Sequence, residues 1–273
     1  MDIEKMTELI LEFQEKDPCN RISAEIAKKP EYAGRKIYEN AVLGIAAADD
    51  PVIKSLKNNK EANIDLRQPE EWLSGAGTVI SVFSSFAGWL VKENTGGDMP
   101  SDSWLHGRIE GQEAIVKMAQ MLAKRIEEEG YAVVVPALDP RLKVYMKSTG
   151  DSPEYTSNWS ERHVAYAAGL GTFGLSGGLI TRLGTAGRFI SIVTDLPLDP
   201  TPGTFELKQE YCKGCGACIL ACPVYAISAN EPKDHSACDA WLEKVKEQEN
   251  PYFGCGKCQS GMPCENSFPN TNL

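Results

Sequence analysis

The sequence predicts an α/β (α+β) fold in two parts, an α/β domain over residues 1–200 and a smaller cysteine-rich domain over residues 201–273. Two observations lead to this prediction. Up to about residue 195, apolar and β-branched runs alternate with segments of helical spacing, which is typical of layered α/β domains. Eight of the nine cysteines then fall between residues 212 and 264. A chain of 273 residues is long enough for both parts.

The first third of the chain predicts one amphipathic helix and two strands. Apolar residues recur at helical intervals over residues 3–13, and Asp17-Pro18 ends that helix. The apolar run at residues 41–48 and the β-branched run at residues 78–83 predict buried strands. The polar segment at residues 57–71 lies between them, and we expect it to be a solvated connection.

The remainder of the α/β part predicts further helices and strands. A long helix begins at about Gly107, where apolar residues recur every three or four positions, and Gly130 provides its C-terminal cap. The segments that follow predict a strand at residues 131–136, a short helix at residues 157–168 and a strand at residues 188–195. The proline-rich stretch at residues 196–203 then predicts the domain boundary.

A first group of cysteines has the spacing of an iron–sulfur ligand set. Cys212, Cys215, Cys218 and Cys222, followed by Pro223, form C-x2-C-x2-C-x3-C-P, the spacing that surrounds a 4Fe-4S cluster. In proteins with two such clusters, the fourth cysteine of this run binds the other cluster. The motif therefore predicts a second group of cysteines further along the chain.

The second group is formed by Cys238, Cys255, Cys258 and Cys264. We assign Cys264 as the fourth ligand beside Cys212, Cys215 and Cys218, and Cys222 as the fourth ligand beside Cys238, Cys255 and Cys258. Eight thiolates would then hold two 4Fe-4S clusters. Zinc and disulfides are the alternatives, because paired C-x2-C units also suit zinc, although zinc sites rarely use a three-cysteine run that ends in Cys-Pro. Cys19 is left over, and we expect an ordinary thiol there.

A glycine motif at residues 169–174 matches the dinucleotide-binding pattern G-x-G-x-x-G, and Asp195 follows it at about the expected distance. That fingerprint requires a strand before the first glycine and a helix after the last. Here the preceding residues 161–167 favour a helix, and Ser176-Gly177-Gly178 favours a turn. The surroundings therefore argue against nicotinamide or flavin binding, while close approach of another large, flat ligand remains compatible with the glycines.

Three short stretches before the cysteines carry a family resemblance. They are Ser160-Glu161-Arg162, Ala168-Gly169-Leu170-Gly171 and Thr194-Asp195-Leu196-Pro197-Leu198. With the cysteine pattern, they resemble the epoxyqueuosine reductase and reductive dehalogenase superfamily, most clearly over residues 155–264. The resemblance implies a corrinoid-binding α/β domain, a cobalamin cofactor and a ferredoxin-like domain with two 4Fe-4S clusters. The family also has a lone cysteine between its two groups, which supports Cys238 as a ligand.

The resemblance also implies roles for individual residues. Glu161 and Arg162 are expected to contact corrinoid or substrate, or to form a bracing ion pair. Gly169, Gly171 and Gly174 would let the backbone lie against the corrin. In epoxyqueuosine reductases, an aspartate that acts as the general acid lies shortly before the Glu-Arg pair. An ungapped comparison puts Tyr155 there, as in the dehalogenase branch, whereas a small gap restores Asp151. Both are candidate proton donors, since a phenol is protonated at pH 7 and a buried carboxyl can be.

Composition restricts the partners and the location. The formal charge of -10 and a pI near 5.0 leave no overall basic surface for a nucleic-acid backbone. The chain ends nine residues after Cys264, without the helical extension that helps many epoxyqueuosine reductases to hold tRNA, so we expect no nucleic-acid partner. Residues 1–5 begin no signal peptide, and no run approaches the roughly 18 apolar residues of a membrane span. We therefore expect a cytoplasmic protein without a membrane partner.

Together these features predict an iron–sulfur oxidoreductase. Electrons from a low-potential donor such as a ferredoxin or flavodoxin would pass through two clusters to a corrinoid, and then to an unidentified small substrate. One alternative is an electron-transfer protein without a corrinoid. The other is a reductive activator of a separate corrinoid protein, with no small substrate of its own.

Overall fold

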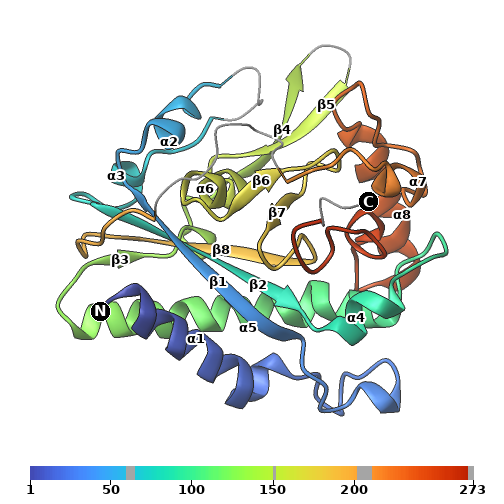
Figure 1. Ribbon diagram of the computed structural model, residues 1–273, viewed down its shortest axis with the longest axis horizontal. Coiled ribbons are helices and arrows are strands. Elements are labelled where there is room, and N and C mark those ends of the chain that lie inside the picture. The colour runs from blue at the N-terminus through green and yellow to red at the C-terminus, as the bar shows by residue number, and fades with distance from the viewer. Residues whose placement is uncertain (60–64, 150–151, 202–210, 270–273) are drawn as a thin grey trace.

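The computed structural model describes residues 1–59, 65–149, 152–201 and 211–269 (Figure 1). The strands are β1 (Tyr38–Ala47), β2 (Thr78–Phe86), β3 (Val133–Val134), β4 (Val144–Thr149), β5 (Ser152–Ser157), β6 (Gly171–Phe173), β7 (Leu179–Thr181) and β8 (Gly187–Thr194). The α-helices are α1 (Ile3–Lys16), α2 (Pro51–Ser55), α3 (Pro69–Trp72), α4 (Gly88–Glu93), α5 (Asp102–Glu128), α6 (Glu161–Ala167), α7 (Ala217–Leu220) and α8 (His235–Glu249). Short 3-10 helices are η1 (Pro18–Asn20), η2 (Pro30–Tyr32), η3 (Pro136–Leu138) and η4 (Lys257–Gln259).

A four-stranded antiparallel sheet in the order β1-β2-β8-β3 forms the centre of the molecule (Figure 1). All nine residues of β2 are buried, because β1 and β8 flank this strand and other elements cover both faces of the sheet (Figure 1). Ile80 of β2 lies opposite Ile45 of β1 and Ile192 of β8, so apolar side chains form a continuous row across three strands. The predicted strands at residues 41–48, 78–83 and 188–195 are confirmed.

Two predicted elements differ in length. The strand expected at residues 131–136 is reduced to Val133 and Val134, because Pro136 begins η3. The helix expected at residues 157–168 begins only at Glu161, since the residues up to Ser157 belong to β5.

Helices α1 and α5 cover one face of the sheet (Figure 1). Met6 and Ile10 of α1 and Met118 and Leu122 of α5 are buried in one core cluster with the sheet residues. Each helix begins at a side-chain cap: Asp2 accepts a hydrogen bond from the amide of Lys5, and Ser101 accepts one from the amide of Trp104. The Ser101 cap explains why α5 begins ahead of the predicted position at Gly107.

The opposite face carries α6 with the β4–β5 and β6–β7 hairpins (Figure 1). Trp159, just before α6, packs edge to face on Trp72 at the end of α3, with ring centroids 5.7 Å apart. Gly44 of β1 permits the end of α6 to approach, because a Cβ there would lie 2.3 Å from the carbonyl oxygen of Ala168. Close contact with the sheet therefore fixes the position of α6.

The cysteine-rich segment packs directly on the α/β part, beside α4 and β7 (Figure 1). Asn94, which follows α4, donates hydrogen bonds to the carbonyl of Cys255 and the hydroxyl of Ser260, both at 3.1 Å. The amide of Thr185 donates to the carbonyl of Cys264 at 2.9 Å. The predicted boundary at residues 196–203 remains a prediction, because its last two residues lie outside the described ranges.

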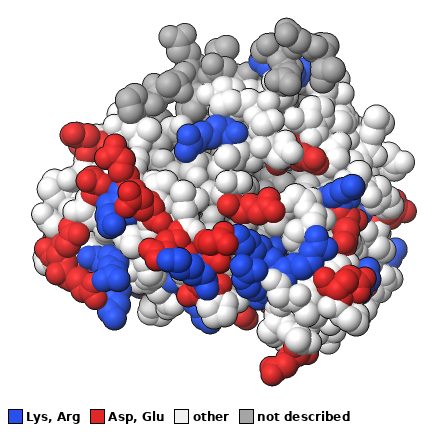
Figure 2. Space-filling model, turned by 60° about the horizontal axis from the view of Figure 1, so that its bottom comes forward, with Lys and Arg blue, Asp and Glu red and all other residues white. Residues whose placement is uncertain are grey.

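The face that carries α1 shows acidic and basic side chains intermingled (Figure 2). Ion pairs such as Lys16–Glu12, at 2.8 Å, join neighbouring turns of α1. No helix among the described residues is long and apolar enough to cross a membrane.

Candidate functional site

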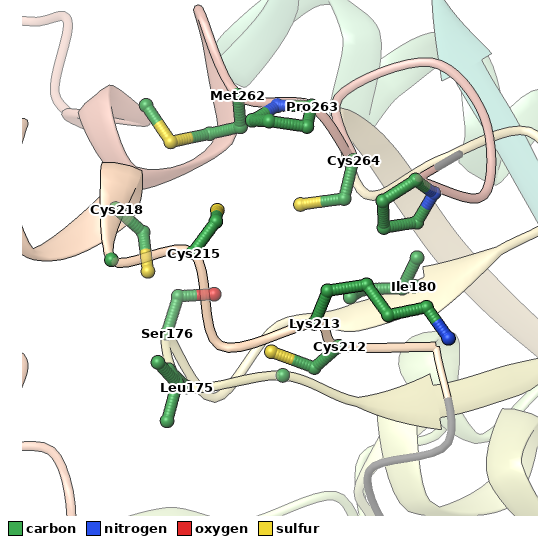
Figure 3. Close-up of a pocket in the computed structure, with 13 residues that line it drawn as sticks. Leu175, Ser176, Ile180, Cys212, Lys213, Cys215, Cys218, Met262, Pro263 and Cys264 are labelled. Carbon is green, nitrogen blue, oxygen red and sulfur yellow. The ribbon is translucent and has the colours of Figure 1, made fainter. Parts of the chain in front are cut away.

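Four cysteines surround one cavity of about 300 Å³ near the surface. They are Cys212, Cys215, Cys218 and Cys264, and their sulfur atoms point toward a common space (Figure 3). Cys215 is exposed, whereas the other three are partly buried. Cys264 therefore lies with the three cysteines to which the sequence assigned it.

Local backbone geometry gathers these four side chains. Gly214 and Gly216 adopt positive φ angles of 65° and 73°, which turn the chain sharply between successive cysteines and begin α7. Cys264 is brought in from the far end of the segment by the hydrogen bond from Thr185. Leu175, Ile180 and Met262 provide apolar walls (Figure 3).

The other four assigned cysteines line a second cavity, of about 220 Å³. Cys222 follows α7 and its sulfur accepts a hydrogen bond from the amide of Ala226 at 3.3 Å. Cys238 comes from the first turn of α8, and Cys255 and Cys258 flank the start of η4. Residues far apart in the sequence thus meet at one cavity, with the same grouping as in the sequence assignment.

Burial makes the free thiols weak acids. It raises the pKa of Cys218 and Cys255 to about 11 and that of Cys264 to about 12. These side chains therefore stay protonated at neutral pH in the absence of metal. A coordinated metal removes the proton from a thiol ligand, so occupation of the sites would release protons.

The buried side chain of Lys257 lies beside the second cavity. It is 3% exposed, and its Nζ donates to the carbonyl oxygens of Asn94 at 2.9 Å and Gly96 at 2.6 Å. Burial lowers its pKa, while Cys255 and Asp98 act in the opposite direction. A cation held here would favour negative charge in the second cavity.

A third cavity, of about 290 Å³, borders the second and contains the predicted residues Glu161 and Arg162. Burial raises the pKa of Glu161 to about 7, against a smaller opposing effect of Ser191 and Arg188. Arg162 lines both cavities. Burial lowers its pKa, and negative charge on Cys258 and Cys238 acts in the opposite direction. The expected bracing ion pair between Glu161 and Arg162 does not form among the described residues.

The three predicted glycines do not share one surface. Gly169 follows α6 with a φ of +73°, where it ends the helix. Gly171 faces the chain itself, because a Cβ there would lie 2.1 Å from the carbonyl oxygen of Ile180. Gly174 lines the first cavity, where a Cβ would lie 3.6 Å from the sulfur of Cys212. The three glycines thus serve different purposes: a helix end, a close approach within the chain and a cavity wall.

The two candidate proton donors are Tyr155 and Asp151. Tyr155 lies on β5 opposite Met146 of β4, and nothing is described of its side chain. Asp151 lies outside the described residues. Both assignments remain predictions.

Sequence reasoning missed Arg188 and Lys257 as neighbours of the cysteines. Arg188 is one of several residues in a predicted strand, and Lys257 reads as an ordinary surface lysine between two cysteines. No sequence signal distinguishes them, because their position depends on the packing of β8 and η4 against the rest of the chain.

Comparisons with known proteins agree with this picture. Residues 206–228 match the family model of the 4Fe-4S binding domain. An epoxyqueuosine reductase from Leadbetterella byssophila is 36% identical over 129 residues, which cover 40% of this chain and 41% of the relative. A tetrachloroethene reductive dehalogenase from Desulfitobacterium hafniense is 36% identical over 115 residues, covering 38% of this chain and 20% of the relative. The matches thus span less than half of either curated relative.

A solved reductive dehalogenase structure, described as suggesting a mechanism for B12-dependent dehalogenation, has the same fold over 83% of this chain and 30% of its own. Its TM-score is 0.55, and its sequence identity is 16%. Both curated names denote oxidoreductases. The predicted resemblance is confirmed: the chain has epoxyqueuosine reductases and reductive dehalogenases as sequence relatives, and a reductive dehalogenase as a neighbour in fold.

Proposed function

We propose that this chain is an iron–sulfur oxidoreductase that holds two 4Fe-4S clusters and carries electrons from the molecular surface to the interior cavity beside Arg162. The supporting observation is that eight cysteines divide into two sets of four, each around its own cavity. Four thiolates are the usual ligand set of such a cluster, so the residues fit the group. When bound, each cluster would supply one-electron transfer.

The two sites differ in their surroundings, and this difference gives the proposed path a direction. The exposed Cys215 loop would present the first site to an external donor, for which we propose a low-potential ferredoxin or flavodoxin. The second site lies next to Lys257, Arg108, Arg162 and Arg188. Positive charge there would favour the reduced state, so electrons would move inward. We propose a cytoplasmic location for this exchange.

A corrinoid fits the described cavities poorly. Cavities of about 300 to 1,000 Å³ are typical of drug-sized ligands, and a corrinoid is larger than these. The two cavities that border Arg162 measure about 220 and 290 Å³, so they do not enclose one. Of the glycines expected to lie against the corrin, Gly171 faces the chain itself and Gly174 lines the first cavity, beside Cys212. Cobalamin dependence is implied by the resemblance, but no step of the proposed path is assigned to cobalt.

The cavity volumes favour a second candidate, a reductive activator that passes electrons to the corrinoid of a separate protein. In this role the chain would need no corrinoid site of its own. The proposed oxidoreductase instead reduces a small substrate in the third cavity, with Tyr155 or Asp151 as the proton donor.

The reconstituted chain distinguishes these functions under anaerobic conditions. Stepwise titration with reduced flavodoxin is expected to place about two electrons on each chain. Uptake of none would contradict both candidates. Hydroxocobalamin is then added before gel filtration. A corrinoid spectrum that elutes with the chain would support the cobalamin-dependent oxidoreductase. If the chain retains no corrinoid but reduces the corrinoid of a separate protein, the result would support the activator.

A further inference from the structure

Three arginines from separate elements meet at the junction of the second and third cavities. Arg162 lies in the first turn of α6, Arg188 lies on β8, and Arg108 lies on α5. Arg162, which keeps solvent-exposed surface, and Arg188 line both cavities, while Arg108 lines the second.

No carboxylate pairs with these arginines among the described residues. None of the three lies within 4.0 Å of an acidic oxygen there. The guanidinium of Arg188 donates to the side-chain oxygen of Gln112, but its buried Nε has no partner. Arg108 lies over the ring of Phe253, 4.4 Å from its centroid. A 4Fe-4S cluster in the second cavity would face these arginines from one side, and Arg162 and Arg188 also border the third cavity, where their charge can meet a second anion.

The polar groups around the third cavity complete an anion-binding surface. The hydroxyl of Thr185 is buried there without a hydrogen-bond partner, and both carboxyl oxygens of Glu161 are buried with only Ser191 and Trp159 near them, outside regular hydrogen-bond geometry. Buried polar atoms normally have partners, so these are positioned to meet a ligand. Trp159, Leu179 and Phe189 provide apolar wall beside them.

We propose that the third cavity binds a small organic carboxylate, held by Arg188 and Arg162, with the hydroxyl of Thr185 and the carboxyl group of Glu161 as its further polar contacts. A guanidinium matches the two oxygens of a carboxylate, and the apolar wall accommodates the carbon skeleton. The volume of about 290 Å³ is at the lower end of small-molecule sites, which restricts the ligand to a small acid. This site deepens the proposed function, because it names the class of molecule that would face the second cluster.

Burial of Glu161 supports a hydrogen-bond donor role in this contact. The pKa of about 7 keeps a large fraction of this carboxyl protonated at neutral pH. The charged group that faces it is Arg188 of β8, while Trp159 and Ser191 contribute neutral groups. His163, next to Arg162, has its pKa lowered to about 4 by burial and is therefore neutral.

Calorimetric titration of the reconstituted chain tests the site with benzoate, acetate, phosphate and chloride as probes. Benzoate is expected to bind. Arg188→Gln should weaken it by about 30-fold or more, as expected for loss of charge-assisted hydrogen bonds. Thr185→Val keeps the side-chain shape and should weaken binding about five- to tenfold. Arg125→Gln, on the exposed surface of α5, is the matched control and should leave binding unchanged.

A second readout separates a ligand site from a merely structural role. Benzoate should shift the electron paramagnetic resonance spectrum of the reduced second cluster, because the arginines border both cavities, and Thr185→Val should reduce that shift at a fixed benzoate concentration. Absence of benzoate and acetate binding, equal binding to the variants, or tighter binding of phosphate or chloride would each overturn the proposal. Iron content is measured on the same samples, so loss of the clusters is distinguished from loss of the anion site.

Discussion

Cys218 and Cys222 are separated by only four positions, yet their side chains line different cavities. Cys218 lies with Cys264 around the first cavity, whereas Cys222 lies with Cys258 around the second. Cys218 lies within the short helix α7, over Ala217–Leu220, and Cys222 follows the end of that helix. One sequence motif therefore supplies thiols to both cavities.

Cys222→Ala is expected to remove the second cluster and to leave the first. Iron per chain should fall from about eight to about four, because only three thiols then remain around the second cavity. Cys264→Ala should remove the first cluster by the same argument. Iron analysis after anaerobic reconstitution measures both changes.

Cys19→Ala is the matched control, because this thiol lies away from both cavities and accepts a hydrogen bond from Lys117 at 2.9 Å. It should keep all of the iron. Full iron content in Cys222→Ala would show that the assignment of the eight cysteines is wrong.

Lys257→Met is expected to make the second cluster harder to reduce. Removal of a buried positive charge disfavours the more negative state, and an effect of about 1 kcal/mol corresponds to a potential lowered by on the order of 50 mV. The carbonyls of Asn94 and Gly96 also lose their donor, which should cost about 2 kcal/mol of stability. A redox titration followed by electron paramagnetic resonance measures the potential.

Lys246→Met provides the control, because this lysine is 55% exposed and lies on α8 away from the cavity. Its effect on the potential should be negligible. If both variants gave the same potential as the parent, the charge of Lys257 would have no influence on the cluster.

Glu161→Gln is expected to change how stability depends on pH. The folded pKa of about 7 lies above the ordinary value of 4.5, so the folded state holds its proton more tightly than the unfolded state. The contribution to stability is therefore complete below pH 4.5 and is lost as the pH rises to 7. Between pH 5.5 and 7.5 the parent should lose about 2 kcal/mol relative to the glutamine variant.

Unfolding in urea at several pH values, under anaerobic conditions, measures this difference. Glu127→Gln serves as the control, because Glu127 is an exposed residue of α5. A constant difference between parent and Glu161→Gln over this pH range would mean that the carboxyl has an ordinary pKa.

Gly256→Ala is expected to disturb the second site far more than Gly34→Ala. Both glycines have positive φ angles, of 66° and 77°, so both substitutions carry the same backbone strain of about 1 kcal/mol. A Cβ at Gly256 would also lie 1.8 Å from Cε2 of Trp104, whereas the space at Gly34 is open. Gly256→Ala should therefore cost about 3 kcal/mol and reduce the iron content of the second site. Chemical unfolding and iron analysis measure the two effects, and equal losses in both variants would contradict the packing argument.

Local sequence signals predicted much of the sheet and the division of the eight cysteines into two groups. The runs at residues 41–48 and 78–83 form strands because their apolar and β-branched side chains suit a buried sheet. The β4–β5 hairpin, by contrast, was not predicted, since polar residues such as Lys147, Ser148 and Glu154 hide its apolar pattern. The segment at residues 57–71 was expected to be solvated, yet Leu66 is fully buried.

The surroundings of the cysteines could not be predicted in the same way. Arg162 and Arg188 are 26 positions apart, and they line one junction only because α6 packs on β8. Lys257 is buried only because the segment around η4 docks near Asn94. Such features depend on tertiary packing, whereas the cysteine motif reflects the local geometry of a cluster ligand set.

The central claim is that the eight cysteines hold two 4Fe-4S clusters, and the most direct test is the content of iron and acid-labile sulfide in the anaerobically reconstituted chain. The reconstituted chain is expected to contain about eight iron and eight sulfide, with no bound zinc. About four iron and four sulfide, or zinc without sulfide, would contradict this claim.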